Sequence, residues 1–228
     1  MARLIAVLIA AHLISDFFLQ TGRWARLKGR RPFLLMHAAL HALFTYLVLQ
    51  TWACWQVVVL IFILHAAIDG LKQRAGKETS TIFLIDQAIH VLSLIGIAWL
   101  SVHFGWIVFF TRTGYGLLIL SAGFITAVNG AGIYIGKFAG ELTELNNLKL
   151  DGLVHGGKWI GRLERALIFL FIIMHYPGGI GFLVAAKSIL RFEEARQQKL
   201  AEYVLIGTFL SFFSAVAIAL LTRWAAGL

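Results

Sequence analysis

The chain has 228 residues, of which 60% are hydrophobic and only 14% are charged. A water-soluble domain of this length cannot bury so much apolar surface, and the recurring apolar segments of about 18 residues or more indicate membrane-spanning helices. The net charge of +9 does not indicate nucleic-acid binding, because the basic residues are spread over several loops and form no single patch. The single cysteine, Cys54, excludes an internal disulfide and a cysteine-based zinc site.

The hydrophobic pattern predicts an all-α, polytopic membrane protein with about eight transmembrane helices. We expect the spans at Arg3–Gln20, Phe33–Gln50, Trp52–Leu71, Thr81–Ser101, Gly116–Gly136, Ile160–Tyr176, Gly179–Arg191 and Ala201–Arg223. The first segment lacks a small-residue cleavage site and carries His12 and Asp16, so we interpret it as a retained span and not a signal peptide. The seventh is short, follows a Pro-Gly-Gly turn, and is expected to be tilted or half-inserted.

The basic residues indicate the orientation of these spans. With alternating spans, seventeen of the twenty Lys and Arg residues fall on one side, and only Arg3, Arg112 and Arg223 fall on the other. Because basic residues accumulate in cytoplasmic loops, this bias predicts that both termini lie outside the cytoplasm. We therefore expect a multi-pass protein of an inner, cytoplasmic membrane, with membrane lipids as partners.

Each of the first four spans carries two ionisable residues spaced i, i+4, which places both side chains on one helix face. The pairs are His12 and Asp16, His37 and His41, His65 and Asp69, and Asp86 and His90. Ionisable side chains inside a bilayer are costly and usually functional. Since four facing helices can supply converging ligands, we expect residues 1–101 to form a metal-binding four-helix bundle and residues 115–228 to form a second four-helix half.

Depth in the membrane sorts these eight residues into two layers about 6 Å apart. The deeper layer contains only histidine, and the layer nearer the cytoplasmic boundary contains three Asp and His37. Imidazole and carboxylate without thiolate suit zinc, with manganese or iron as alternatives. Eight candidates exceed the four ligands of one zinc, so we expect one or two divalent ions per chain, with the remaining residues orienting ligands or acting as bases. The alternative is a buried hydrogen-bonded network without metal.

The second half carries basic residues at its cytoplasmic edge, around a predicted helix N-terminus that favours anions. We expect these cations to bind an anionic substrate, unless they only orient the protein and hold lipid headgroups. They are Lys158, Arg162, Arg165, Lys187 and Arg191. Glu164 lies at the edge of the apolar run and is expected to be a catalytic acid or base, a ninth ligand, or a salt-bridge partner of Lys187 or Arg191.

The strings AHLISDFFLQT, HAALH, HAAIDGLK and DQAIH resemble a bacterial integral-membrane family catalogued as domain of unknown function 3307. The later strings GGKWIGRLERALI, AAKSILRF and AEYVLIGTFLS are similar to members of that family with a longer C-terminal half. The resemblance implies a bacterial integral membrane protein and no specific activity. More loosely, the HxxxD helices are similar to membrane-bound metal-dependent hydrolases linked to the DNA-damage regulon.

These observations favour a membrane-embedded metal-dependent hydrolase with a dinuclear His/Asp site near the cytoplasmic face, acting on a phosphate-bearing or lipid-linked anion. Asp16 or Asp86 is the expected general base, together with Glu164 as a further catalytic candidate. One alternative is a divalent metal transporter or sensor, against which the largely apolar outer halves of the first four spans count. The other is a di-iron membrane oxidoreductase, for which a single HxxxH pair is a weak signal. The oligomeric state stays open.

Overall fold

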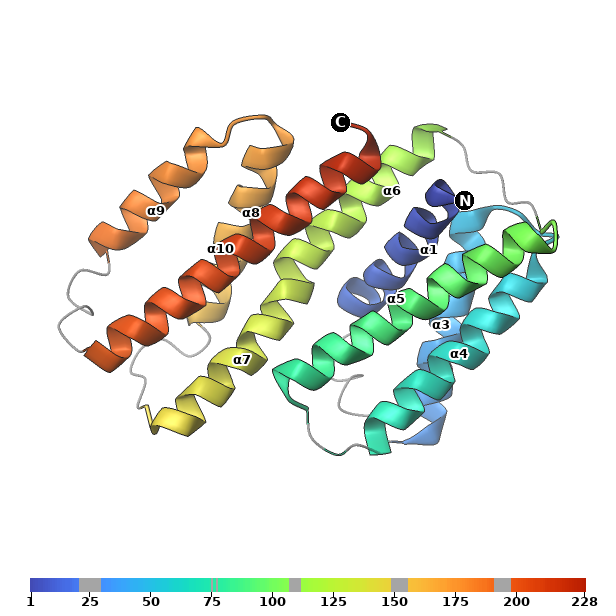
Figure 1. The fold of residues 1–228 in the computed structure, drawn as a ribbon, viewed down its shortest axis with the longest axis horizontal. Helices are drawn as coiled ribbons and strands as arrows, with labels where there is room; N and C mark the ends of the chain where they lie inside the picture. The colour runs from blue at the N-terminus through green and yellow to red at the C-terminus, as the bar shows by residue number, and fades with distance from the viewer. Residues whose placement is uncertain (21–29, 75, 77, 107–111, 149–155, 191–197) are drawn as a thin grey trace. The chain divides into compact units, whose positions relative to one another are not determined.

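The computed structural model describes residues 1–20, 30–74, 76, 78–106, 112–148, 156–190 and 198–228. These described residues form helices and contain no strand (Figure 1), which confirms the all-α fold class. The helices are α1 (Ala2–Ile14), η1 (Ser15–Leu19), α3 (Arg31–Leu49), α4 (Trp55–Arg74), α5 (Ser80–His103), α6 (Arg112–Ile125), η2 (Thr126–Gly130), α7 (Ala131–Asn146), α8 (Gly156–Ile173), α9 (Gly178–Leu190) and α10 (Gln198–Ala226).

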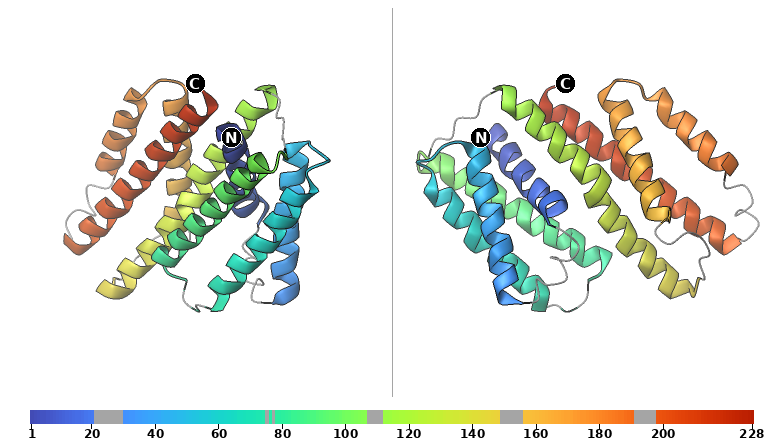
Figure 2. Two further views of the ribbon diagram at one scale, coloured as in Figure 1. Left: turned by 45° about the vertical axis from the view of Figure 1, so that its right-hand side comes forward. Right: turned by 180° about the vertical axis from the view of Figure 1, so that it is seen from behind.

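Contacts divide the chain into two compact units, Met1–Ile125 and Thr126–Leu228. In the first unit, α1, α3, α4 and α5 form a closed ring in which each helix packs against the next, and α6 packs against α1 (Figure 2). We expected the division of the chain between residues 101 and 115. The first unit instead extends through α6, because that helix packs against α1.

Local signals set the start of two helices that carry predicted ligands. Pro32 occupies the first turn of α3, where its fixed φ fits a helix and its missing N–H is not needed. Thr79 precedes α5, and its hydroxyl oxygen accepts a hydrogen bond from the Ile82 backbone N–H at 3.2 Å. These two signals set where each helix begins.

Apolar side chains fill one end of the first bundle. The buried members of this cluster come from all four helices of the ring and from the turn between α3 and α4; they are Val7, Leu8, Ala42, Leu49, Cys54, Val57, Ile61, Leu94, Ile97 and Ala98. Ile61 precedes His65 by about one turn on α4, and Leu94 follows His90 by about one turn on α5. The apolar cluster therefore lies next to the deeper histidine layer, on the side away from the aspartates.

Within the described residues, six helical segments are long and apolar enough to cross a membrane: Ala2–Leu19, Arg31–Leu49, Trp55–Arg74, Ser80–His103, Gly114–Asn146 and Gln198–Ala226. A multi-span helical protein is thus supported, but the expected sixth and seventh spans do not reach this standard. The helix α8 carries four charged residues, at positions 158, 162, 164 and 165. The helix α9 has 13 residues and extends about 20 Å, less than the hydrocarbon core of about 30 Å.

The second unit is built around α10, which packs against η2, α7 and α8. The helix α9 packs against α8 and completes a helical hairpin after the Pro177 turn. The buried apolar cluster of the second unit includes Phe169 and Ile172 of α8 and Ala219 of α10. The described residues of this unit include four of the five basic residues that we predicted to bind substrate.

Candidate metal centre

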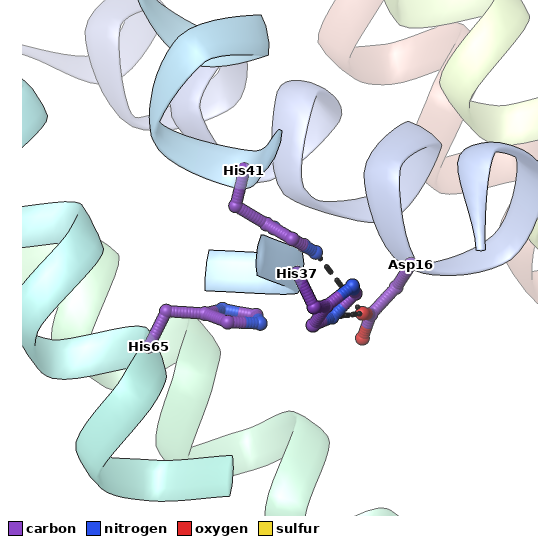
Figure 3. Close-up of side chains that lie close together, drawn as sticks. All are labelled: Asp16, His37, His41 and His65. Atoms are coloured by element: carbon purple, nitrogen blue, oxygen red, sulfur yellow. Dashed lines mark hydrogen bonds and ion pairs between the residues drawn. The ribbon is translucent and has the colours of Figure 1, made fainter. Parts of the chain in front are cut away.

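Asp16 lies in a widened helical turn that the sequence did not predict. The segment η1 is a π-helical turn, in which the Gln20 N–H bonds to the Ser15 carbonyl at 3.1 Å. Such single π-turns often occur at functional sites, because they rotate the side chains that follow. Asp16 lies at the start of this turn, and its Oδ1 is 3.2 Å from Nε2 of His37 and 3.2 Å from Nε2 of His41 (Figure 3).

Four side chains form a first ligand group. The ligand atoms of Asp16, His37, His41 and His65 lie within 4.8 Å of one another. Figure 3 shows His37 and His41 pointing at the Asp16 carboxylate, with His65 reaching toward them from α4. The rings of His41 and His65 are stacked, with centroids 3.8 Å apart. One carboxylate and three imidazoles from three helices can hold a divalent ion of zinc type.

His65 also belongs to a second ligand group with Asp69 and His90, again within 4.8 Å. Its Nε2 lies 3.6 Å from Asp69 Oδ2, and the Nε2 of His90 lies 3.9 Å from Asp69 Oδ1. This second group draws on α4 and α5, whereas the first draws on η1, α3 and α4. The two ligand groups therefore share one histidine, which could serve two ions only by offering a different ring nitrogen to each, because each nitrogen has one lone pair.

The interior of this cluster is buried and contains imidazole nitrogens without partners. His12, His65 and His90 are at most 4% exposed, and within the described residues their Nε2 atoms have no hydrogen-bond partner. Buried polar atoms almost always have a partner, so three such nitrogens in one cluster require an explanation. A cation bound by His65 and His90, which belong to the ligand groups, would supply one for those two residues, and the donor set therefore fits a divalent metal ion.

Polar contacts outside the two ligand groups orient the ligands. The Nδ1 of His90 lies 2.9 Å from the backbone carbonyl oxygen of Asp86, which suits an Nδ1–H donor and leaves Nε2 without a proton. Gln87 donates from its side-chain Nε2 to Asp16 Oδ2 at 3.0 Å. This contact orients the Asp16 carboxylate.

His12 and Asp86 lie beside the two ligand groups and not within them. The Nε2 of His12 is 3.7 Å from Asp16 Oδ2, and its ring centroid is 4.9 Å from that of His90. Asp86 Oδ2 instead accepts a 2.8 Å hydrogen bond from Lys72, a residue that we had counted only among the topology-determining cations. The structure thus brings all eight predicted ligands into one bundle interior, with six of them in the two groups.

A small cavity adjoins the deeper histidine layer. It is lined by His12, His41, His65 and His90 and, toward the apolar cluster, by side chains that include Thr45 and Ser93. Neither Thr45 nor Ser93 is among the residues predicted for the site from the sequence. Thr45 continues the His37 and His41 row one turn further along α3, so the i, i+4, i+8 spacing contained a signal for it.

Comparison with known sequences identifies the segment that holds this centre. A sequence model of a family described as protein of unknown function (DUF3307) matches residues 4–113. Residues 4–113, just under half of the chain, are thus similar to the DUF3307 family. The DUF3307 segment contains α1, α3, α4 and α5 and all eight predicted ligands, whereas the resembling strings beyond residue 113 lie outside the match. No curated protein and no solved structure matches the chain.

The predicted basic residues beyond the DUF3307 segment have separate surroundings. Lys187 donates to Glu164 Oε2 at 2.8 Å, which is the salt bridge that we gave as one alternative for Glu164. Lys158 is exposed, and the guanidinium carbon of Arg162 lies 5.3 Å from the Trp159 ring centroid. Arg191 lies outside the described residues. Substrate binding by these cations stays a prediction.

Arg165 is buried among neutral oxygens. Its Nε and Nη2 donate to the backbone carbonyls of Ala127 and Val128, both at 2.9 Å, and its Nη1 donates to Ser211 Oγ at 3.2 Å. The two carbonyls belong to η2, a second π-helical turn, and a side chain at Gly132 would place its Cβ 2.5 Å from Nη2. Each guanidinium nitrogen thus has a partner inside the second unit.

Proposed function

We propose that the protein is a membrane-embedded metal-dependent hydrolase with a dinuclear His/Asp site near the cytoplasmic face, acting on an anionic, phosphate-bearing or lipid-linked substrate. The observation that carries this proposal is the pair of ligand groups that share His65. All donors in these groups are imidazole or carboxylate, which favours zinc, with manganese or iron as alternatives. The resemblance of the HxxxD helices to metal-dependent hydrolases points in the same direction.

The chain's own residues have separate roles in this proposal. The residues of the two groups hold the ions, which would acidify a bound water and polarise the substrate oxygen. Asp86 stands outside both groups and is our candidate general base. Within the described residues its buried Oδ1 has no hydrogen-bond partner, while Lys72 and Gln87 contact its Oδ2. A carboxylate oxygen that is held in a fixed position and makes only a 3.6 Å contact with His90 Nδ1 could accept a proton from water.

The apolar cluster favours hydrolysis over metal transport. A transporter needs a polar path on both sides of its binding site. On the side of the histidine layer away from the aspartates, buried aliphatic side chains such as Val57, Leu94 and Ile97 fill the bundle. The metal ions and the substrate would then enter and leave the site through the aspartate end alone.

Membrane topology belongs to the proposal as well. We place the aspartate end of the bundle in the cytoplasmic half of a bacterial inner membrane and both termini outside the cytoplasm, from the distribution of basic residues. The shortness of α9 does not alter this arrangement. Because α8 and α9 follow each other, two full crossings and a hairpin that returns to the cytoplasm both leave α10 to cross outward. The exposed Lys158 and the half-buried Arg162 of α8 would then contact anionic headgroups of lipid or substrate.

Elemental analysis of the detergent-purified full chain tests the proposal, with the double variant His65→Ala/Asp69→Ala as the control. We expect about two zinc, manganese or iron ions per chain, lost in the double variant, together with metal-dependent hydrolysis of phosphoesters such as p-nitrophenyl phosphate or phosphatidic acid. Protein purified without chelator that holds no metal would overturn the proposal. Bound iron with oxygen consumption and no hydrolysis would support the di-iron alternative instead.

A further inference from the structure

A third position continues the ligand row of α4 toward the aspartate end. His65, Asp69 and Lys72 are spaced i, i+4, i+7 and therefore share one helix face. His65 and Asp69 are each 4% exposed, whereas the Lys72 side chain is 27% exposed. The row thus runs from the buried histidine layer to a cation at the accessible end of the site.

Lys72 is held in place by a buried carboxylate. Its Nζ donates to Asp86 Oδ2 at 2.8 Å, and the Asp86 side chain is 4% exposed. The ammonium also lies 5.9 Å from the Phe83 ring centroid. A lysine ammonium has three N–H donors, and in the described part of the chain Asp86 accepts the one hydrogen bond that Lys72 makes. Within the described residues, the other two N–H donors of Lys72 make no hydrogen bond.

We propose that Lys72 is an oxoanion-binding residue of the metal centre, and that it holds the phosphate group of the substrate beside the ions. This inference rests on the proposed function and names the residue that selects its substrate class. A positioned ammonium next to metal ligands attracts and orients phosphate oxygens, since charge-assisted hydrogen bonds are the stronger ones. Lys72 belongs to the same bundle as the ligands, unlike the basic residues of the second half.

A purely structural role of Lys72 would give a different experimental result. If Lys72 only neutralised the buried Asp86 carboxylate, its loss would disturb folding or metal content but not the response of a correctly loaded site to phosphate. The full chain in detergent can be loaded with cobalt(II), whose visible absorption reports its coordination. Titration with inorganic phosphate then measures anion binding at the centre without any reaction.

We expect phosphate to change the cobalt absorption of the unmodified protein in a saturable way. Lys72→Met should keep the same cobalt content and weaken phosphate binding by at least about tenfold, whereas Lys72→Arg should keep most of the affinity because a guanidinium also binds oxoanions. Arg74→Met is the matched control: Arg74 is an exposed cation near the end of the same helix and should be replaceable without effect. If Lys72→Met loses cobalt, Lys72→Gln takes its place, since an amide keeps a donor for Asp86 without the charge.

Mixed micelles separate the two sources of a phosphate group. Competition by phosphatidic acid, but not by phosphatidylcholine, would support the inference with a lipid phosphate as the ligand. A response to inorganic phosphate alone would support it with a soluble phosphate compound. Equal phosphate affinity in both uncharged Lys72 variants and the unmodified protein would overturn the inference and leave the metal centre standing. Absence of bound cobalt from the unmodified protein would overturn the proposed function, and this inference with it.

Discussion

Among single residues, His65 has the most central position, because it is the residue that both ligand groups contain. His65→Ala should therefore abolish binding of both ions, whereas His37→Ala removes a ligand from the first group alone and should leave about one ion per chain. His103 is the control: it lies at the far end of α5, stacked on Trp99 with ring centroids 5.1 Å apart, and His103→Ala should leave the metal content unchanged. Elemental analysis of the three purified variants measures the number of ions bound per chain in each.

The difference in metal content between His65→Ala and His37→Ala tests whether His65 is a ligand of both ions. Equal metal loss in His65→Ala and His37→Ala would mean that the two groups hold a single ion between them. Equal retention in all three variants would mean that neither group binds metal. Neither result could come from general misfolding alone if the variants keep the same size-exclusion profile and helical content as the unmodified protein.

Gln87 provides a second test at the scale of a residue. It touches no ion in the proposed arrangement, but its side-chain amide donates to Asp16 Oδ2 at 3.0 Å. Partners that orient a ligand typically contribute 10–100-fold to metal affinity, so Gln87→Ala should weaken metal binding by roughly that factor while the number of sites stays the same. Competition with a chelator of known affinity measures the change. Gln73→Ala, at an exposed position of α4, should show none.

The spacing of the ionisable pairs was enough to predict which side chains meet. Each i, i+4 pair occupies one helix face, and the alternating direction of the spans predicts that four of the five histidines lie in one layer. The contacts among the rings of His12, His41, His65 and His90 agree with this prediction. The contact between Lys72 and Asp86 could not be predicted this way. It depends on how far α4 and α5 are displaced along each other, and a lysine near a cytoplasmic boundary already has an ordinary explanation in topology.

At the scale of helices, the two π-helical turns are the features that periodicity could not predict. A π-turn shifts the hydrogen-bond register by one residue, and its position depends on tertiary contacts more than on local preference. In η1 the turn serves Asp16, and in η2 the freed carbonyls of Ala127 and Val128 serve Arg165. Helix α8 also departed from expectation, since a hydropathy pattern measures apolar content but not how charge limits a full crossing. The shortness of α9 agrees with the expectation of a tilted or half-inserted seventh segment.

The packing of η2 against α8 makes a stability prediction. Arg165→Met removes three hydrogen bonds and leaves buried carbonyls unpaired, which should destabilise the second unit by about 2–5 kcal/mol. Arg162→Met should have little effect, because Arg162 lies against the exposed Trp159. Thermal unfolding in detergent compares the two variants. A stable Arg165→Met protein with a specific loss of activity would instead support the predicted role of Arg165 in substrate binding.

Two glycines of α7 provide a matched pair for the same interface. A Cβ at Gly132 would lie 2.5 Å from the Arg165 guanidinium, which three hydrogen bonds hold in place, whereas a Cβ at Gly136 meets nothing within 4 Å. Gly132→Ala should therefore lower the melting temperature. Gly136→Ala should leave it unchanged or raise it, because alanine favours a helix over glycine by up to about 1 kcal/mol. Equal behaviour of the two variants would mean that Arg165 does not depend on the space at Gly132.

For the whole molecule, the division into two compact units predicts that metal acts on only one of them. All eight candidate ligands belong to Met1–Ile125, and the Arg165 contacts belong to Thr126–Leu228. An ion that binds only the folded first unit stabilises it by about 2.7 kcal/mol at a hundred times its dissociation constant. Without the ion, the carboxylates should repel one another, and the buried imidazole nitrogens should lose the cation that they bind. The first unit should therefore open more often, while the second keeps its own apolar contacts.

Hydrogen exchange with and without a chelator measures this difference helix by helix. We expect faster exchange in α1, α3, α4 and α5 after chelation, strongest around the buried His41, His65 and His90, and unchanged exchange in α8 and α10. The variant His65→Ala should exchange like the chelated protein even when zinc is supplied, because it lacks the ligand that both groups use. A uniform increase along the chain would mean that the two units unfold together. Unchanged exchange in all helices would mean that the bundle is held by its polar and apolar contacts alone, and that metal is not part of its fold.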